Sequence, residues 1–315
     1  MSIVNKALDK MKEERSQDAA RTFEGKSLRE QRPASLAGGG GSEIGSHSPI
    51  AGPPPDRIVT IDRIALQSAG MVPGEADRVA AAEQYRSVKQ DLIRYCAAES
   101  GSAPLLSQFI MVTSALPGDG KTFTSLNLAL SMVSERDHDV LLVDGDLAMS
   151  NMTRSLGMAE EPGLLDVLRE PERRFSSIMY STDVQRLFVV PAGKWSEDAS
   201  ELLASERMTQ LVSEIALRHP RRIVVFDSSP VLVSSDSRVL ARSVGQIVFV
   251  VSAGTTLQND VKQAVGLLKG GGRRLTLVMN QTHPEDLLSS LVGYRYGYGY
   301  GARGGRPPNP AVPPK

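Results

Sequence analysis

From residue 108 onward, short apolar runs rich in β-branched residues alternate with polar segments long enough to form helices. Near-continuous apolar strands separated by helices are typical of a parallel sheet that is covered on both faces. The pattern therefore predicts an α/β fold, with ligands bound at the carboxyl ends of the strands. Strands are expected at residues 109–113, 140–143, 187–190, 223–226, 247–251 and 275–279, and helices at 76–97, 121–134, 200–218 and 257–269.

The same pattern divides the chain into three parts. Residues 1–75 hold a short amphipathic stretch, expected to pack on its own domain or on a partner, followed by a linker rich in Gly, Pro and Ser. Residues 76–292 carry the strand and helix pattern of the folded domain. Residues 293–315 contain tyrosine, arginine, glycine and proline but too few aliphatic side chains to build a core, so we expect a disordered tail.

Composition narrows the classes of function. The formal net charge of the 315 residues is zero, which gives the whole chain no electrostatic bias toward nucleic acid or anionic lipid. The single cysteine rules out an intramolecular disulfide bond. No apolar run approaches the roughly 20 residues of a membrane helix, and the N-terminus lacks the apolar core of a signal peptide. We therefore expect a cytoplasmic protein that only a partner could hold at a membrane.

A glycine-rich loop joins the strand at 109–113 to the helix at 121–134. Its sequence ends in Gly-Lys-Thr, the arrangement in which backbone N–H groups and a helix N-terminus surround phosphate groups. The usual first glycine is replaced by Ala115, which we read as the mark of a subtype. The alternative is a strand-to-helix turn without a ligand. The residues predicted to bind nucleotide here are Pro117, Gly118, Asp119, Gly120, Lys121, Thr122 and Phe123.

Acidic residues follow two other predicted strands. Asp144 and Asp146 come directly after residues 140–143, and Asp227 comes after residues 223–226. Carboxylates at the strand ends beside a phosphate loop are well placed to hold Mg²⁺, and either residue of the first pair could accept a proton from an attacking hydroxyl. The alternative is that each Asp begins a loop as a cap. Asn280 ends the last strand, where its amide could read an adenine edge or form a turn.

Together these motifs resemble those of the bacterial tyrosine kinases (BY-kinases) of capsular and exopolysaccharide synthesis. The chain is most similar to the free-standing cytoplasmic form that is associated with exosortase-type loci. Residues 83–89 resemble the Glu-x-x-Arg-x-x-Arg/Lys motif that mediates ring assembly in the family. Residues 163–168 and 191–193 resemble two further family segments. The tail resembles the family's phosphorylated tyrosine cluster.

The resemblance implies an ATP- and Mg²⁺-dependent tyrosine autokinase that regulates exopolysaccharide polymerisation or export. Lys121, Asp144 and Asp146 would serve catalysis, with Asp144 favoured as the base, and Thr122 and Asp227 would complete the metal site. The implied acceptors are Tyr294, Tyr296, Tyr298 and Tyr300. Glu83, Arg86 and Lys89 would join subunits into a ring that phosphorylates neighbouring tails. The implied partners are a membrane polysaccharide copolymerase and a tyrosine phosphatase.

Two other functions compete with this interpretation. A positioning ATPase of the MinD/ParA kind shares the fold, but it carries a lysine where this chain has Leu116 and it lacks a terminal tyrosine cluster. A non-catalytic ATP-dependent scaffold is the other alternative, because residues 148–150 depart from the basic residue and proline usual in the family. Nucleic-acid binding by the basic, tyrosine-rich tail is not expected, since no nucleic-acid-binding fold accompanies it.

Overall fold

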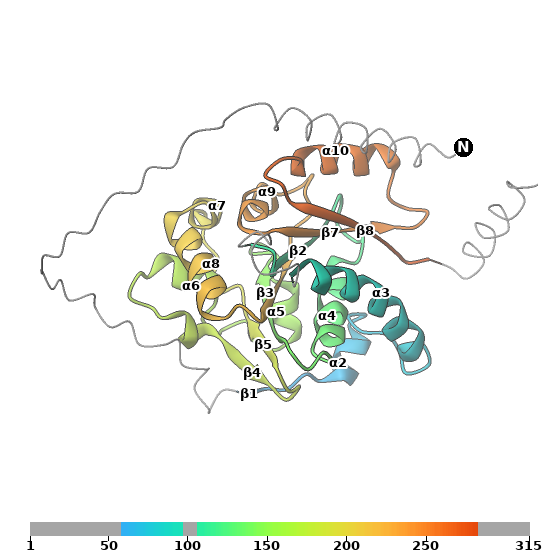
Figure 1. Cartoon of the computed structure of the whole chain (residues 1–315), viewed down its shortest axis with the longest axis horizontal. Helices are drawn as coiled ribbons and strands as arrows, with labels where there is room; N and C mark the ends of the chain where they lie inside the picture. The colour runs from blue at the N-terminus through green and yellow to red at the C-terminus, as the bar shows by residue number, and fades with distance from the viewer. Residues whose placement is uncertain (1–57, 97–105, 283–315) are drawn as a thin grey trace, which may run out of the picture. The chain divides into compact units, whose positions relative to one another are not determined.

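The computed structural model describes residues 58–96 and 106–282, which form an eight-stranded, mostly parallel sheet (Figure 1). Neighbouring strands run parallel except β4 and β5, which are antiparallel. The fold class expected from the sequence is therefore confirmed. In sheet order the strands are β1 (Ile58–Val59), β4 (Tyr180–Thr182), β5 (Leu187–Val190), β3 (Asp139–Gly145), β6 (Arg222–Ser228), β2 (Phe109–Ser114), β7 (Gln246–Ser252) and β8 (Arg274–Asn280).

The six predicted strands are all present, and each matches or exceeds its predicted range by at most two residues at either end. Two short strands, β1 and β4, were not predicted, because two or three residues are too few to show a period. Residues 58–75 were placed in the N-terminal extension, but Ile61, Leu66 and Val72 are buried in the core of the sheet domain. The folded domain therefore begins earlier than the apolar pattern indicated.

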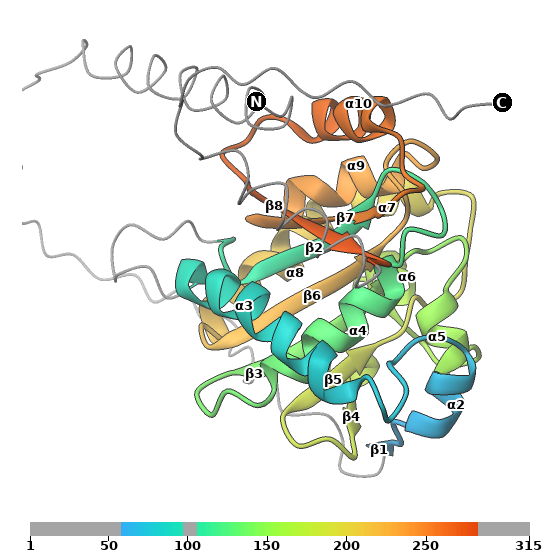
Figure 2. The same cartoon turned by 90° about the vertical axis from the view of Figure 1, so that its right-hand side faces the viewer.

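Helices cover both faces of the sheet, and the buried side chains form two separate cores. On one face, Phe109 and Met111 pack with residues of α6, α8 and α10. On the other face, Ile110 and Val112 pack with residues of α2, α3 and α4. Figure 2 shows α3 and α4 crossing that second face. Alternate residues of the central strands therefore serve opposite cores, which explains why these strands are apolar throughout.

Local sequence explains where individual helices form. In α8 the buried residues Met208, Leu211, Val212, Ile215 and Ala216 follow the spacing of one helical face. The Ser205 hydroxyl caps that helix by accepting a hydrogen bond from the Met208 N–H. The helices are α2 (Arg63–Ser68), α3 (Arg78–Cys96), α4 (Lys121–Met132), α5 (Asn151–Ser155), α6 (Leu164–Arg169), α7 (Ala199–Leu203), α8 (Glu206–Arg218), α9 (Asp236–Leu240) and α10 (Gln258–Leu268), with 3₁₀ turns at Phe175–Ile178 and Ala241–Ser243.

Candidate active site

The predicted phosphate loop joins the carboxyl end of β2 to the first turn of α4. Gly118 and Gly120 have φ angles of 87° and 93°, which L-residues with side chains rarely adopt. Gly120 occupies the N-cap position of α4, where no side chain caps the helix, so the N–H groups of its first turn remain available to an anion. Ala115 is completely buried in the core, which gives a physical reason for a small residue there.

Side chains from three places hold this loop in shape. The Asp119 carboxylate accepts hydrogen bonds from the Leu116 N–H at 3.1 Å and from the Thr256 hydroxyl at 2.7 Å. The Asn280 amide donates to the Asp119 carbonyl at 3.0 Å, and the Gln281 amide donates to the Gly118 carbonyl at 3.1 Å. The end of β8 is therefore fastened to the phosphate loop. Contact between Asn280 and an adenine ring stays a prediction.

The loop leaves no room for a side chain at its last glycine. A Cβ atom added to Gly120 would lie 2.0 Å from Nδ2 of Asn280, too close for any substitution without displacing that amide. Glycine is therefore required at position 120 for two reasons: the backbone is left-handed, and the end of β8 approaches closely.

Asp144 and Asp227 lie side by side, because their backbones are register partners at the ends of β3 and β6. Oδ2 of Asp144 accepts from the Thr153 N–H at 2.9 Å and from the Thr153 hydroxyl at 2.6 Å, while Oδ1 accepts from the Asp146 N–H at 3.1 Å. The Ser125 hydroxyl donates to Oδ1 of Asp227 at 2.9 Å. Oδ2 of Asp227 is buried and has no hydrogen-bond partner within the described residues.

Burial raises the pKa of both carboxyl groups. The pKa of Asp144 rises to about 6, chiefly because the group is removed from water. The pKa of Asp227 rises to about 7, because of its burial and because of the nearby charge of Asp144. A bound cation would relieve both effects, so the unpartnered oxygen of Asp227 fits a Mg²⁺ ligand. No group of three or more His, Cys, Asp or Glu residues among residues 58–96 and 106–282 forms a metal cluster by itself.

Two cavities meet at Lys121. The first, of about 630 Å³, is lined by the segment from Ala69 to Met71 and by predicted nucleotide-binding residues: Gly118, Gly120, Lys121, Thr122, Phe123 and Asn280. The second, of about 570 Å³, is lined by Pro117, Lys121, Asp146 and residues that follow β5 and β6. Lys121, Gly118 and Asn151 belong to both linings. Most of the predicted nucleotide-binding residues and Asp146 therefore border two cavities that share Lys121.

Asp144 and Asp146 differ in their access to the second cavity. Asp146 lines it, and its exposed fraction is 6%, whereas that of Asp144 is 0%. Burial raises the pKa of Asp146, and the charge of Lys121 opposes that rise. Asp146 is therefore the carboxylate that an entering group would meet, while the oxygens of Asp144 are engaged by hydrogen bonds from within the protein.

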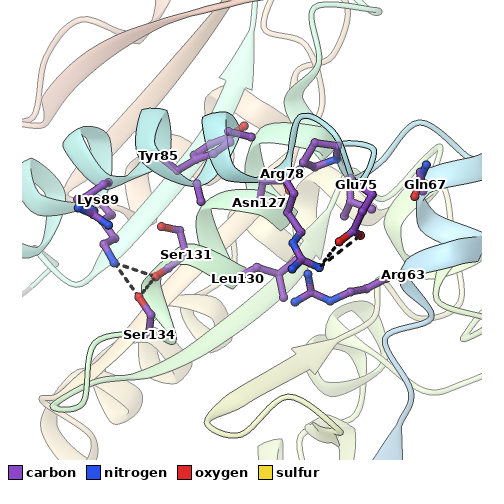
Figure 3. Close-up of a pocket in the computed structure, with 15 residues that line it drawn as sticks. Arg63, Gln67, Glu75, Arg78, Tyr85, Lys89, Asn127, Leu130, Ser131 and Ser134 are labelled. Carbon is purple, nitrogen blue, oxygen red and sulfur yellow. Dashed lines mark hydrogen bonds and ion pairs between the residues drawn. The ribbon is translucent and has the colours of Figure 1, made fainter.

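The predicted assembly residues lie on α3, away from these two cavities. Glu83 and Arg86 form an exposed ion pair at 3.3 Å. Lys89 is buried, and its ammonium group donates to the Ser131 carbonyl at 3.1 Å and to the Ser134 hydroxyl at 2.7 Å, and pairs with Glu135 at 2.8 Å. Figure 3 shows Lys89 pointing toward α4 at one end of a cavity of about 500 Å³ between α2, α3 and α4. Lys89 is thus already used within its own chain, and ring assembly stays a prediction.

Several predictions fall outside the described residues. The acceptor cluster Tyr294, Tyr296, Tyr298 and Tyr300, the amphipathic stretch and the linker all lie there. Within the described residues, none of the helices is both long and apolar enough to cross a membrane.

Sequence reasoning missed residues that position the site. Thr153, Ser125 and Thr256 hydrogen-bond to the predicted acidic residues, and Gln281 holds the loop. The spacing of Ser125 offered a signal, since it lies one helical turn after Lys121 on α4. Thr153 and Thr256 stand in loops or short helices without any period, so their roles depend on the tertiary fold.

Comparison with known proteins places these features among kinases. The model of an AAA domain family matches residues 107–259. The putative tyrosine-protein kinase CapB of Staphylococcus aureus is 30% identical over 218 residues, which cover 69% of this chain and 90% of CapB. The crystal structure of the VpsO kinase domain shares 29% identity with a TM-score of 0.51, covering 63% of this chain and all of that one.

One relative is much longer than the matched region. The putative tyrosine-protein kinase EpsB of Ralstonia nicotianae is 28% identical over 225 residues, which cover 71% of this chain but 27% of EpsB. The chain therefore spans about a quarter of the length of this relative.

Proposed function

Since this chain belongs to the bacterial tyrosine-protein kinases, we propose that it transfers the γ-phosphoryl group of ATP to tyrosines of its own C-terminal cluster. The observation that carries the proposal is the position of Lys121 between two cavities. One cavity is framed by the phosphate loop and takes the nucleotide. The other holds Asp146 and is open to an acceptor. The phosphoryl group would therefore pass from one cavity to the other beside the ammonium group of Lys121.

The phosphate loop binds and orients ATP in this proposal. The N–H groups at the start of α4 and the Lys121 ammonium group hold the β- and γ-phosphates. When bound, Mg²⁺ supplies positive charge that neutralises the transferred group, and Thr122 and Asp227 would hold it, with Asp144 and Asp146 beside them. The hydrogen bonds from Asn280 and Gln281 keep the loop in the conformation that this binding needs.

Asp146 is the residue that we assign to proton transfer. The tyrosine hydroxyl has an unperturbed pKa of about 10, so it needs a group to take its proton as it attacks. The phenolic oxygen bonds to the γ-phosphorus, the bond to the β,γ-bridging oxygen breaks, the proton passes to the Asp146 carboxylate and ADP leaves. The sequence favoured Asp144 for this task. Its complete burial and its three hydrogen bonds make it better suited to positioning Asp146, whose N–H it binds.

We extend the proposal to the cellular role. The resemblance to polysaccharide kinases supports a regulator of exopolysaccharide polymerisation or export, working in the cytoplasm as a ring whose subunits phosphorylate neighbouring tails. A membrane copolymerase would recruit the ring to the inner face of the membrane, and a tyrosine phosphatase would reset it. Native mass measurements before and after phosphatase treatment test this extension, and identical oligomer distributions would count against it.

The kinase activity itself is tested by phosphotyrosine mapping of the full chain after incubation with labelled ATP and Mg²⁺. We expect label on residues 294–300 in the wild-type chain and none in Lys121→Met. Lys262→Met removes an exposed lysine of α10 and is the matched control, expected to retain the label. Equal label in Lys121→Met and the wild-type chain would refute the assignment of the site. A chain that binds ATP but never carries label would instead be a scaffold.

A further inference from the structure

Three large apolar side chains line the cavity that contains Asp146 and are exposed there. Met149, Trp195 and Val233 all line it, and their exposed fractions are 57%, 55% and 65%. They follow three different strands, β3, β5 and β6, and so come together only in the fold. Large exposed apolar side chains gathered at one opening mark a surface that binds another molecule. Trp195 is also the only tryptophan of the chain.

The rim of the same cavity is acidic. Besides Asp146, the lining includes Glu197 and Asp236, and Lys121 is its one basic residue within the described part of the chain. Asp236 accepts a hydrogen bond from the Ser200 hydroxyl. The neighbouring Asp198 lies 3.9 Å from Arg169. Glu197 is exposed, and the described residues offer its side chain no hydrogen bond or ion pair. It is therefore the carboxylate at this opening that is free to meet a cation from outside.

The chain itself contains a segment of complementary chemistry. Residues 294–306 hold four tyrosines and three arginines and no acidic residue. Arg295 stands between Tyr294 and Tyr296, whereas Tyr298 and Tyr300 are flanked by glycine alone. An arginine can pair with a carboxylate while an adjacent tyrosine ring lies against tryptophan. The first two tyrosines of the cluster therefore match the rim better than the last two.

We propose that Trp195 and Glu197 form a docking site that selects tyrosines next to arginine in the tail of a second copy of this chain. Arg295 pairs with Glu197, one flanking tyrosine ring lies against Trp195 and Met149, and the other enters the cavity toward Asp146. Trp195 and Glu197 are specificity-determining residues that do not touch the transferred phosphoryl group. The inference rests on the proposed kinase function, because a docking site can select tyrosines for phosphorylation only if the protein is a kinase.

Trp195 fluorescence tests docking without any need for catalysis. The protein is the full chain carrying Arg295→Glu, Arg303→Glu and Arg306→Glu, so that its own tail does not compete for the rim. It is titrated with a synthetic peptide of residues 291–306 and with the same peptide carrying the three arginine-to-glutamate changes. We expect the first peptide to change the emission of Trp195. We expect the second peptide to bind at least about tenfold more weakly. No change in emission with the first peptide, or equal affinities of the two, overturns the proposal.

Phosphosite mapping at early times tests selection. In the wild-type chain we expect Tyr294 and Tyr296 to be labelled before Tyr298 and Tyr300. Glu197→Arg and Arg295→Glu should each remove that preference, and the double variant Glu197→Arg, Arg295→Glu should restore it by exchanging the two charges. Trp195→Ala should slow labelling by about threefold to tenfold, the usual value of an aromatic contact. Glu172→Arg makes the same charge change at an exposed residue outside the lining and is the control.

The two proposals fail in different ways. If the tail is labelled but Glu197→Arg and Arg295→Glu leave the order of labelling unchanged, the docking proposal is wrong and the kinase proposal stands. If no tyrosine is labelled while the fluorescence titration behaves as expected, the docking site is real and the kinase proposal is wrong.

Discussion

The carboxylates at the strand ends and Lys89 on α3 both bury charge, but they do so in opposite ways. Lys89 has a carbonyl, a hydroxyl and the Glu135 carboxylate within hydrogen-bonding distance, so its charge is compensated inside the chain. Asp227 lies beside Asp144, a like charge, and one of its oxygens has no partner in the described residues. Burying a charge costs free energy unless an opposite charge or hydrogen bonds compensate for the lost water. The carboxylates Asp144 and Asp227 thus form a site that a cation can bind. The ammonium group of Lys89 instead stabilises the packing of α3 against α4.

The sharpest way to break this comparison is Asp227→Asn, which removes one charge of the buried carboxylate pair and keeps the shape. We expect the rate of phosphorylation to fall by about 10²–10³-fold, the usual cost of losing one group that stabilises a charged transition state. Initial rates with saturating ATP and Mg²⁺ provide the measurement. Asp137→Asn, at an exposed aspartate, should leave the rate unchanged. A fully active Asp227→Asn chain would remove Asp227 from the metal site.

The same substitution should stabilise the protein in the absence of nucleotide. Because the folded pKa values of Asp144 and Asp227 are raised to about 6 and about 7, the folded state binds protons more tightly than the unfolded state. Stability should therefore fall as pH rises from about 4 to about 7, and the fall should be smaller in Asp227→Asn. Urea unfolding at pH 8 should show a gain on the order of 2 kcal/mol. Equal stability of the two chains across this range would contradict the raised pKa of Asp227.

Lys89→Met tests the other half of the comparison. It keeps most of the apolar stem but removes the hydrogen bonds of the buried ammonium group to the Ser131 carbonyl and the Ser134 hydroxyl and its ion pair with Glu135. We expect a loss of about 1–3 kcal/mol in the free energy of unfolding, because hydrogen bonds made by a charged group contribute about this much. Urea denaturation gives the value, and Lys262→Met is again the matched control. An unchanged midpoint would show that Lys89 is free for another role, such as contact with a neighbouring subunit.

Thr153→Val tests whether Asp144 positions Asp146. It removes the hydroxyl that donates to Asp144 and accepts from the Ala192 N–H, while the backbone bond from Thr153 to Asp144 remains. We expect kcat to fall about tenfold with little change in KM for ATP, because Asp144 would position Asp146 less well. Thr209→Val, at an exposed threonine of α8, is the control. A change in KM alone would place Thr153 in nucleotide binding instead.

Arg86→Ala should have the smallest effect on stability. The Arg86–Glu83 pair is exposed on both sides, and such pairs contribute roughly 0–1 kcal/mol. Sedimentation at several protein concentrations should nevertheless show weaker self-association if Arg86 joins subunits as predicted. An Arg86→Ala chain that assembles like the wild-type protein would leave the ring without this contact.

The sequence was informative where local pattern and tertiary structure agree. Strands buried on both faces are apolar along their whole length, and Gly118, Gly120 and Lys121 occupy a loop whose spacing is set by phosphate geometry. It was uninformative where one residue acts through a distant partner. Nothing near Lys89 in the chain indicates that it reaches Glu135. Trp195 and Asp146 line one cavity only because β3 and β5 are neighbours. The sequence favoured Asp144 over Asp146 as the base, and the complete burial of Asp144, which argues against that preference, is a property of the fold.

The hydrogen bond from Gln281 to the Gly118 carbonyl has a geometric consequence for the acceptor cluster. Tyr294 stands 13 positions after Gln281 (294 − 281), and an extended chain spans at most about 3.5 Å per residue, so the first acceptor stays within roughly 45 Å of the phosphate loop. A linker this short keeps the acceptor tyrosines at an effective concentration in the millimolar range around the phosphate loop of the same chain. Dilution of the protein does not lower that value, so labelling within one chain would not depend on protein concentration, whereas the proposed labelling by a second copy slows once dilution separates the subunits.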